Sequence, residues 1–286
     1  MKLSGRNAII TGASRGFGRA LALKFIAEGA SVVMCARSSR DLERTAGEAL
    51  AMAGPGQRVV SVRADVSKTG DVENLIETAL RELSRIDVLV NNAGIYGPKG
   101  PLEEMSWRDW VDAVEINLLG TVYACRSLLP HFKKNGYGKI INLSGGGATA
   151  PLPGISAYAA SKAAVVRFTE TLAEECRGSG IDINAVAPGA LNTRLLDEIL
   201  EAGPEKVGRA FYEKCIRQRQ TGGTPLSRGT ELIAFLASAE SDGITGRLIS
   251  AVWDNWETLP SRRTELESSD IYTLRRIVPE DRGKSW

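Results

Sequence analysis

Short apolar segments alternate with longer helical patterns along most of this 286-residue chain. Such alternation predicts a parallel sheet with helices on both faces, because parallel strands need crossover connections. No repeat or low-complexity linker divides the chain, so we expect one doubly wound α/β domain of about seven strands over residues 1–252, with ligands bound at the carboxyl ends of the strands. The expected strands are 7–11, 31–36, 58–63, 87–90, 139–143, 182–186 and 247–252. The expected helices include 18–28, 41–52, 69–83, 107–132, 157–176 and 230–238.

The composition is that of an ordinary globular protein. Hydrophobic residues make up 43% of the chain and charged residues 24%, and the net charge is +2 with lysine and arginine spread along the sequence. We therefore expect neither nucleic acid nor a membrane as partner. The absence of a signal-peptide pattern and of an apolar run of ~20 residues predicts a cytoplasmic protein. The four scattered cysteines lack metal-ligand spacing, which indicates buried free thiols and no metal site.

A glycine-rich turn follows the first expected strand. Residues 11–18 read Thr-Gly-Ala-Ser-Arg-Gly-Phe-Gly and lead into a helix. Glycines in such a turn let the backbone approach a pyrophosphate, which then lies at the N-terminus of the helix. The spacing is Gly-x-x-x-Gly-x-Gly instead of the commoner Gly-x-Gly-x-x-Gly, but the strand–turn–helix context favours a dinucleotide site over a simple turn.

The end of the second expected strand indicates which dinucleotide is bound. An NAD site usually has an acidic residue here for the ribose 2′-hydroxyl, whereas this chain has Ala36 followed by Arg37 and Ser38, with Arg15 in the glycine-rich turn. Two guanidinium groups without a carboxylate suit a 2′-phosphate, because arginine makes charge-assisted bidentate bonds to phosphate oxygens. These residues favour NADP(H); NAD(H) is the alternative if the arginines are only solvated surface residues.

A tyrosine and a lysine, Tyr158 and Lys162, lie four positions apart within an expected helix and therefore on the same face of it. A free tyrosine is a poor acid or base at neutral pH, since its pKa is about 10. A lysine ammonium within a few ångströms favours the phenolate and lowers that pKa. Such a pair also occurs by chance on ordinary helix faces, so its meaning depends on the other motifs.

Three further polar segments complete a set of motifs. Residues 91–94 (Asn-Asn-Ala-Gly) follow the fourth expected strand, Asn117 lies inside a long expected helix, and Pro188 and Gly189 follow the sixth strand. In this order and at these distances, together with the glycine-rich turn and the tyrosine–lysine pair, they resemble the short-chain dehydrogenase/reductase family in its common single-domain branch. The resemblance covers about residues 4–252 and implies a Rossmann-like fold.

The resemblance also implies a role for each matching residue. Tyr158 would be the general acid/base, Lys162 would bind the nicotinamide ribose and lower the tyrosine pKa, and Asn117 would hold a water molecule of a proton relay. The glycine-rich turn would line the pyrophosphate, and the loop after the sixth strand would orient the nicotinamide. The residues expected to contact the cofactor are Gly12, Ser14, Arg15, Gly16, Phe17, Gly18, Arg37, Ser38, Asp65, Val66, Asn92, Ala93, Gly94, Tyr158, Lys162, Pro188, Gly189 and Thr193.

The family's fourth catalytic residue is a serine that hydrogen-bonds the substrate oxygen. The usual interval of thirteen residues before the tyrosine leads to Gly145, whereas Ser144 stands fourteen residues before Tyr158. A one-residue insertion in segment 146–154, which is rich in glycine and proline, would place Ser144 correctly. Ser144 is therefore the expected catalytic serine, and an impaired or unusual site is the alternative.

Two stretches are expected to shape the substrate site and the assembly. Residues 190–224 mix apolar side chains at helical spacing with arginines, which would suit a lid of helices over the cleft. Residues 253–286 extend beyond the family's usual end, and segment 269–279 has a cap-like start, an apolar face and a proline stop. We expect this extension to pack over the active site or across a subunit interface. By analogy, helices 107–132 and 157–176 would pair subunits in a homodimer or homotetramer.

The expected function is NADP-dependent interconversion of a ketone and a secondary alcohol by hydride transfer on a small-molecule substrate, with Tyr158, Lys162, Ser144 and Asn117 as catalytic residues. Reduction of a 3-ketoacyl thioester and oxidation or reduction of a sugar or nucleotide sugar are alternative activities. An NADP(H)-binding sensor or scaffold without turnover is the alternative of another class. The sequence identifies neither the substrate nor the direction and stereochemistry of the reaction.

Overall fold

The computed structural model describes the whole chain, Met1–Trp286. Seven parallel strands form one sheet in the order β3-β2-β1-β4-β5-β6-β7, which is the doubly wound α/β fold expected from the sequence. The chain builds outward from β1 to β3, crosses back to β4, and builds outward again to β7, so the topological switch point lies between β1 and β4. The strands are β1 (Asn7–Thr11), β2 (Ser31–Ala36), β3 (Val59–Arg63), β4 (Val88–Asn91), β5 (Gly138–Leu143), β6 (Ile181–Ala187) and β7 (Leu248–Ser250).

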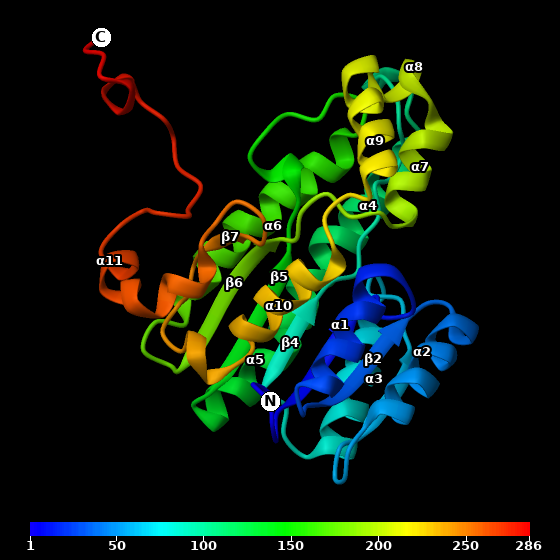
Figure 1. Cartoon of the computed structure of the whole chain (residues 1–286), viewed down its shortest axis with the longest axis vertical. Helices are drawn as coiled ribbons and strands as arrows, with labels where there is room; N and C mark the ends of the chain where they lie inside the picture. The colour runs from blue at the N-terminus through cyan, green and yellow to red at the C-terminus, as the bar shows by residue number, and fades with distance from the viewer.

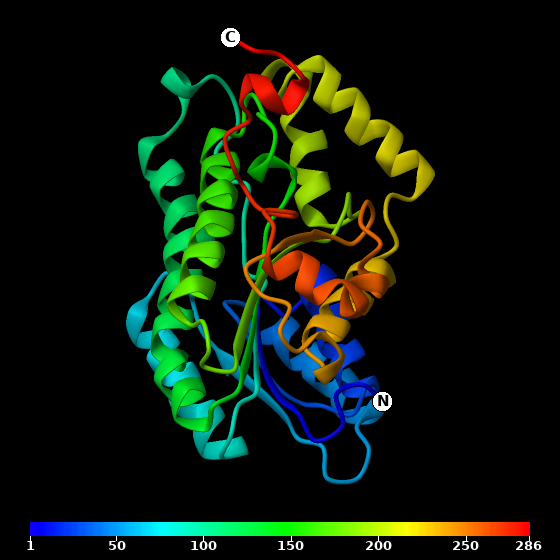
Figure 2. The ribbon, with the colours of Figure 1, turned by 90° about the vertical axis from the view of Figure 1, so that its left-hand side faces the viewer.

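Helices cover both faces of the sheet, which Figure 2 shows nearly edge-on between two helical layers. The helices are α1 (Gly16–Ala27), α2 (Ser39–Met52), α3 (Thr69–Leu83), α4 (Trp107–Val114), α5 (Gly120–Asn135), α6 (Ser156–Glu175), α7 (Arg194–Ala202), α8 (Pro204–Val207), α9 (Arg209–Thr221), α10 (Leu226–Leu236) and α11 (Arg263–Glu267). On one face α1 packs against α2 and α10, and on the other α3 packs against α5 and α4 against α6. Helices α7, α8 and α9 lie beyond the sheet, above the carboxyl ends of the strands (Figure 1).

Two apolar cores hold the layers together, one on each side of the sheet. Neighbouring residues of β1 belong to different cores: Ile10 packs with Phe25 and Phe235, whereas Ile9 packs with Phe132. This division follows from the strand geometry, because successive side chains point to opposite faces. Both faces of the central strands are thus covered, which is why these strands are apolar almost throughout. All four cysteines are buried and unpaired, as expected.

The helix expected over residues 107–132 is interrupted. A π-helical turn, Glu115–Leu119, separates α4 from α5. At its centre, the side chain of Asn117 accepts a hydrogen bond from the Ile95 N–H at 2.8 Å and donates one to the Ile95 carbonyl at 2.9 Å. Single π-helical turns inside longer helices occur frequently at functional sites. Here the turn fixes a buried amide to the loop that follows β4.

The chain beyond β7 packs along the edge of the sheet. The ring of Trp256 is buried and lies 5.5 Å from that of Phe235 in α10. The helix that the pattern of residues 269–279 indicates is absent. Instead, the Tyr272 carbonyl accepts a hydrogen bond from the Leu248 N–H at 2.7 Å, so this segment satisfies a backbone donor of the outermost strand. This backbone bond attaches the segment to the open edge of β7.

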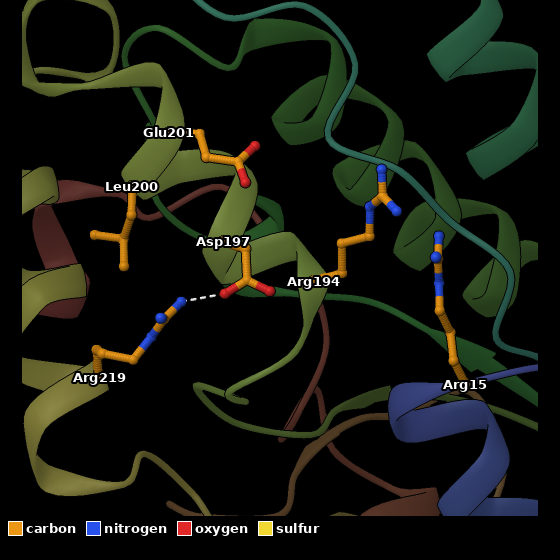
Figure 3. A pocket seen from close by; sticks show the side chains of 6 residues that line it. All are labelled: Arg15, Arg194, Asp197, Leu200, Glu201 and Arg219. Atoms are coloured by element: carbon orange, nitrogen blue, oxygen red, sulfur yellow. Dashed lines mark hydrogen bonds and ion pairs between the residues drawn. The ribbon is translucent and has the colours of Figure 1, made fainter.

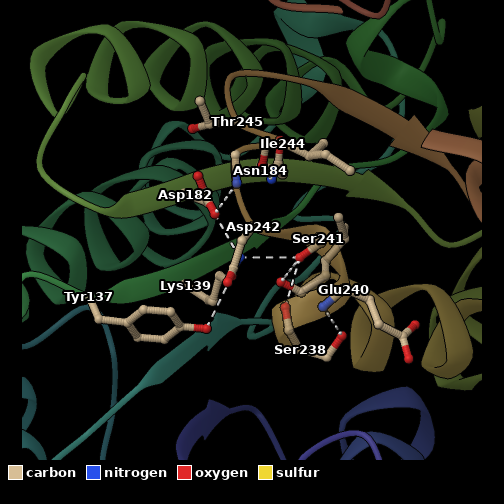
Figure 4. A network of polar contacts seen from close by, with 12 residues as sticks. Tyr137, Lys139, Asp182, Asn184, Ser238, Glu240, Ser241, Asp242, Ile244 and Thr245 are labelled. Atoms are coloured by element: carbon tan, nitrogen blue, oxygen red, sulfur yellow. Dashed lines mark hydrogen bonds and ion pairs between the residues drawn. The ribbon is translucent and has the colours of Figure 1, made fainter. Parts of the chain in front are cut away.

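A buried lysine organises the opposite, amino-terminal end of β5 (Figure 4). Lys139 is 1% exposed, and its ammonium lies 2.6 Å from a carboxylate oxygen of both Asp182 and Asp242. It also donates to the Ser241 hydroxyl at 3.3 Å. A buried charge is tolerated only with such partners. The network anchors the connection from α10 to β7 and lies away from the carboxyl ends of the strands.

Candidate active site

The turn between β1 and α1 presents bare backbone at the carboxyl end of a central strand. Gly12 and Gly16 have φ angles of +67° and +55°, in the left-handed region that favours glycine. A Cβ at Gly18 would overlap the Gly12 carbonyl oxygen, so no larger residue fits there. The geometry suits a pyrophosphate held at the N-terminus of α1.

The loop after β4 is clamped to this turn. The Asn92 side-chain amide donates to the carbonyl oxygens of Thr11 and Gly12 at 2.9 and 3.2 Å. The backbone N–H groups of Asn92 and Ala93 donate to the Thr11 hydroxyl at 3.0 and 3.1 Å. These bonds fix the ends of β1 and β4 at the topological switch point, where ligands bind in this class of fold.

The remaining expected cofactor contacts surround the same edge of the sheet. Arg15 and Arg37 are exposed and form no ion pair, and Ser38 caps α2 by accepting from the Asp41 N–H at 3.4 Å. The Asp65 carboxylate accepts from its own turn, from the N–H and hydroxyl of Ser67 at 3.1 and 2.8 Å.

Two of the expected cofactor residues are used in packing. The Phe17 side chain belongs to the core beneath α1, where it would meet any Cβ placed at Gly229 of α10. Gly189 has φ +99°, and a Cβ there would meet Thr224 and Val252 at 2.7 and 2.8 Å. Both positions therefore shape the walls of the cleft through the fold itself.

Lys162 lies between Asn117 and Tyr158. A Cβ at Gly94 would stand 3.1 Å from Asn117 Oδ1 and 3.4 Å from Lys162 Nζ, so both side chains lie against this one glycine. Lys162 Nζ donates to the Leu143 carbonyl at 2.7 Å and lies 5.8 Å from the centre of the Tyr158 ring. The structure thus brings together three of the four residues expected to be catalytic.

Burial sets the protonation of this pair. It raises the pKa of Tyr158 to about 12 and lowers the pKa of Lys162 to about 8, because removal from water disfavours the charged form of each group. Burial is the dominant cause of the raised tyrosine pKa, and the lysine ammonium that lies near the ring also donates to the Leu143 carbonyl. At neutral pH, Tyr158 is therefore a neutral phenol that can donate a proton, and Lys162 is mostly protonated.

The hydrogen bonds of Asn117 are largely used within the protein. Its side-chain amide donates to the Ile95 carbonyl and to the Ser161 hydroxyl at 2.9 and 3.0 Å, and its backbone carbonyl accepts from the Thr121 hydroxyl at 3.0 Å. Since an amide group has two N–H donors, both are occupied. A water molecule at this residue, as the resemblance implies, would have to use the remaining acceptor capacity of its oxygens.

At the end of β5, the side chain of the expected catalytic serine, Ser144, does not lie at the tyrosine hydroxyl. The Ser144 hydroxyl is buried and has no hydrogen-bond partner. A Cβ at Gly145, in contrast, would overlap the hydroxyl oxygen of Tyr158 and stand 3.2 Å from its Cζ atom. The residue opposite the tyrosine hydroxyl is therefore Gly145, at the ordinary interval of thirteen residues, and Ser144 does not occupy that position.

Three helices of segment 190–224 cover the tyrosine. Tyr158 packs in a small apolar cluster with Leu196 and Ile199 of α7, Val207 of α8 and Cys215 of α9. On another side, the ring of Tyr96 meets the Tyr158 ring edge-on, with ring centres 4.6 Å apart. These contacts shield the candidate catalytic phenol from water.

A cavity of about 610 Å³ lies between these helices and the glycine-rich turn (Figure 3). Its wall is mostly charged. The guanidinium groups of Arg15 and Arg194 point into the same part of it, while Arg219 is ion-paired with Asp197. The lining residues are Arg15, Arg194, Asp197, Leu200, Glu201 and Arg219.

Similarity to known proteins identifies the family of this chain. Residues 6–203 match the family model described as short chain dehydrogenase. The chain belongs to the short-chain dehydrogenase family. It is 38% identical over 245 residues to "3beta-hydroxysteroid dehydrogenase 1" of Eggerthella lenta, a match that covers 85% of this chain and 91% of that protein.

Solved structures of oxidoreductases resemble this short-chain dehydrogenase over most of its length. A 3-ketoacyl-(acyl-carrier-protein) reductase from Brucella melitensis complexed with NADH is 34% identical with a TM-score of 0.75, covering 87% of this chain and 97% of that one. An actinorhodin polyketide ketoreductase variant with NADPH is 28% identical with a TM-score of 0.78, covering 87% and 96%. The chain is thus an oxidoreductase of a family that binds a nicotinamide dinucleotide and acts on small molecules. None of its helices has the length and apolar character that a membrane span requires.

Several residues of this short-chain dehydrogenase's site escaped the sequence patterns. Tyr96 and Ser161 contact Tyr158 and Asn117 only because the fold brings the loop after β4 against α6. No local pattern marks either residue. The position of Gly145 opposite Tyr158 is predictable from the sequence, because the usual thirteen-residue interval before the tyrosine leads to Gly145 without any insertion.

Proposed function

We propose that this short-chain dehydrogenase interconverts a ketone and a secondary alcohol with NADP(H) as its preferred cofactor. The grouping of Tyr158, Lys162 and Asn117 at the carboxyl edge of the sheet carries the proposal. A buried neutral phenol next to an ammonium group is suited to exchanging a proton with a substrate oxygen. Similarity to a protein named as a hydroxysteroid dehydrogenase and to one named as a ketoreductase supports the same type of reaction.

The residues around the glycine-rich turn fit the cofactor. Gly12 and Gly18 leave room for a pyrophosphate against bare backbone, and the N-terminus of α1 favours its negative charge. Arg15 and Arg37 are exposed without carboxylate partners, and Ala36 offers no carboxylate to a ribose hydroxyl. This distribution of charge favours the 2′-phosphate of NADP(H) over NAD(H).

The bound cofactor would supply or accept the hydride. In the direction of reduction, Tyr158 donates its proton to the ketone oxygen, and the Lys162 ammonium stabilises the phenolate that is left. Asn117 holds Ile95 and Ser161 in place on either side of this group. Helices α7 to α9 keep water away from the reacting atoms.

Reduction of a 3-ketoacyl thioester is a second candidate, supported by 34% identity to the Brucella reductase. A sensor that binds NADP(H) without turnover is less well supported, because it has no need of the lysine and tyrosine side by side.

We also propose that subunits pair through α4, α5 and α6. Trp107 of α4 is 71% exposed and Leu119 53% exposed, an apolar surface that pairing would cover.

The proposal is tested with Tyr158→Phe. NADPH oxidation is measured over a panel of ketones, 3-ketoacyl thioesters and keto sugars, and NADPH binding is measured by its fluorescence. We expect a loss of at least about 100-fold in turnover with nearly unchanged binding, since proton transfer contributes 10²–10⁴-fold. Tyr137→Phe, at the opposite end of β5 beside the Lys139 network, is the control and should behave as the unaltered protein. Retention of more than a few per cent of the rate by Tyr158→Phe would refute the assignment.

A further inference from the structure

The strongest unassigned feature of the site is the end of β5, where residues 144–147 read Ser-Gly-Gly-Gly. The three atoms nearest to a Cβ placed on Gly145 all belong to Tyr158, and the hydroxyl oxygen is the first of them. A side chain at position 145 would therefore occupy the space of the tyrosine hydroxyl. Glycine is the one residue that lets this hydroxyl rest against the strand end.

Ser144 points elsewhere. Its N–H donates to the Val186 carbonyl at 2.8 Å, which continues the pairing of β5 with β6. Gly145 is extended as well, with φ −176° and ψ 177°. Side chains of successive extended residues lie on opposite sides of the backbone, so the Ser144 hydroxyl lies on the side away from Tyr158. This agrees with its lack of any hydrogen-bond partner.

We propose that Tyr158 acts on the substrate oxygen without a side-chain hydroxyl from position 145, that Gly145 makes this arrangement possible, and that the preferred substrates carry a hydroxyl on the carbon next to the carbonyl. The inference rests on the proposed function and names its substrate class: α-hydroxy ketones and the corresponding vicinal diols. Gly145 acts as a positioning residue through Tyr158.

The substrate class follows from the missing donor. A donor aimed at the oxygen on which charge develops contributes about 10²–10³-fold to the rate. With glycine at position 145, the protein lacks a second side-chain donor there, and a neighbouring hydroxyl of the substrate can supply an intramolecular hydrogen bond instead. Gly146 is exposed, and a Cβ placed on it would meet no atom within 4 Å, so the backbone next to Gly145 is open to solvent. In the reduction, the carbonyl carbon gains the hydride and its oxygen gains the Tyr158 proton, while the neighbouring hydroxyl keeps its own proton.

The position of Gly145 is tested without any substrate by a double-mutant cycle in thermal stability. Gly145→Ala should lower the melting temperature by about 3 °C or more, because its methyl group displaces the tyrosine hydroxyl. In a Tyr158→Phe background the nearest atom is the ring carbon at 3.2 Å, so the same substitution should cost less than half as much. Ser144→Ala is the matched control and should give the same shift in both backgrounds. Coupling of Ser144→Ala, but not Gly145→Ala, to Tyr158→Phe would overturn the proposal.

The substrate class is tested with a pair of ketones that differ by one hydroxyl, 3-hydroxybutan-2-one and butan-2-one, and NADPH. We expect kcat/KM to be at least about tenfold higher for the hydroxy ketone. Equal values, including no turnover of either ketone, would overturn the substrate class and leave the coupling of Gly145 to Tyr158 intact. Full turnover by Tyr158→Phe would instead refute the proposed function itself, so the two failures are distinguishable.

Discussion

At the scale of single residues, the buried pair Tyr158 and Lys162 predicts a particular dependence of stability on pH. The pKa of Lys162 falls from 10.5 to about 8 on folding, so between these values the unfolded chain binds a proton that the folded chain does not. Stability therefore rises with pH through this window, by about 3 kcal/mol. The pKa of Tyr158 rises from 10.0 to about 12, so its contribution falls as pH increases from 10 to 12.

Urea unfolding of the unaltered protein and of Lys162→Met at several pH values measures the lysine contribution. The unaltered protein should gain stability relative to Lys162→Met between pH 8 and 10, because the variant has no charge to desolvate. Below pH 8 the difference between the two should be constant. Parallel curves over the whole range would contradict burial of the ammonium.

The preference for NADP(H) is also a residue-scale prediction. Arg37→Ala should weaken NADPH binding about 10- to 100-fold, since a hydrogen bond to a charged group contributes roughly 1.5–3 kcal/mol. NADH, which lacks the 2′-phosphate, should bind about as before. Arg81→Ala removes another exposed arginine, from α3, and serves as control. Fluorescence titration with both cofactors decides the matter, and an equal loss for NADPH and NADH would contradict the preference.

At the scale of elements, the sequence predicts best where local pattern and tertiary packing agree. β2 (Ser31–Ala36) and α3 (Thr69–Leu83) have the expected bounds, because a strand covered on both faces is apolar throughout and an amphipathic helix shows its period. The π-helical turn at Asn117 depends on hydrogen bonds to Ile95, which lies 22 residues away. Segment 269–279 has a helical pattern, but the open edge of β7 offers its backbone a partner. In both segments, the structure includes hydrogen bonds between residues more than twenty positions apart, which a local sequence pattern does not reveal.

The side chain opposite Tyr158 illustrates the same limit within the site. The tyrosine and the lysine of the motif lie on one long helix, α6, and the structure brings the asparagine of the π-helical turn close to that lysine. The orientation of Ser144 could not follow from its identity, because a shift of one residue along an extended segment turns a side chain to the other face. Only the interval between β5 and α6 carried that information.

The lid formed by α7, α8 and α9 gives a prediction of its own. Its start rests on the glycine-rich turn, where a Cβ at Gly16 would meet the Thr193 methyl group at 3.5 Å. Arg194 and Arg15 point into one cavity from the lid and from this turn (Figure 3). A diphosphate at this turn would give Arg194 a second anionic partner besides Glu198, whose carboxylate oxygen lies 3.7 Å from Arg194 Nε. Arg194→Ala should therefore weaken binding of NADPH and NADH alike, by about tenfold.

Arg219→Ala is the matched control for this lid prediction, because Arg219 lines the same cavity but is held in a closer ion pair, with Asp197, than the 3.7 Å pair of Arg194 with Glu198. It should change either dissociation constant by less than about twofold, as expected for removal of one side of an exposed ion pair. Both constants come from the same fluorescence titration. Equal effects of the two variants would mean that the cavity attracts the cofactor only through its overall charge.

At the scale of the whole molecule, the extension after β7 consists of two physically different parts. Leu259 and Leu266 are buried in the core beside α10. Arg247 is buried too, and its guanidinium donates to the carbonyls of Ser269 and Ile271 at 3.0 and 2.8 Å. The residues after 274 run away from the sheet (Figure 1), and Trp286 is 86% exposed. The first part completes the domain, and the second is available to another subunit.

Two truncations separate these parts. Removal of residues 258–286 uncovers the core beside α10 and leaves the Arg247 guanidinium without its carbonyl partners, a change that costs about 3–5 kcal/mol for a buried charge. The melting temperature should fall by at least about 6 °C. Removal of residues 275–286 alone should change the melting temperature by less than about 2 °C, because these residues bury little apolar surface. If the exposed tail contacts a second subunit, this short truncation should lower the oligomeric state or weaken substrate binding. Calorimetry, sedimentation and NADPH-linked KM values on both truncated chains make the distinction. A short truncation that changes neither assembly nor KM, beside a long one that unfolds the protein, would show that the extension serves its own domain alone.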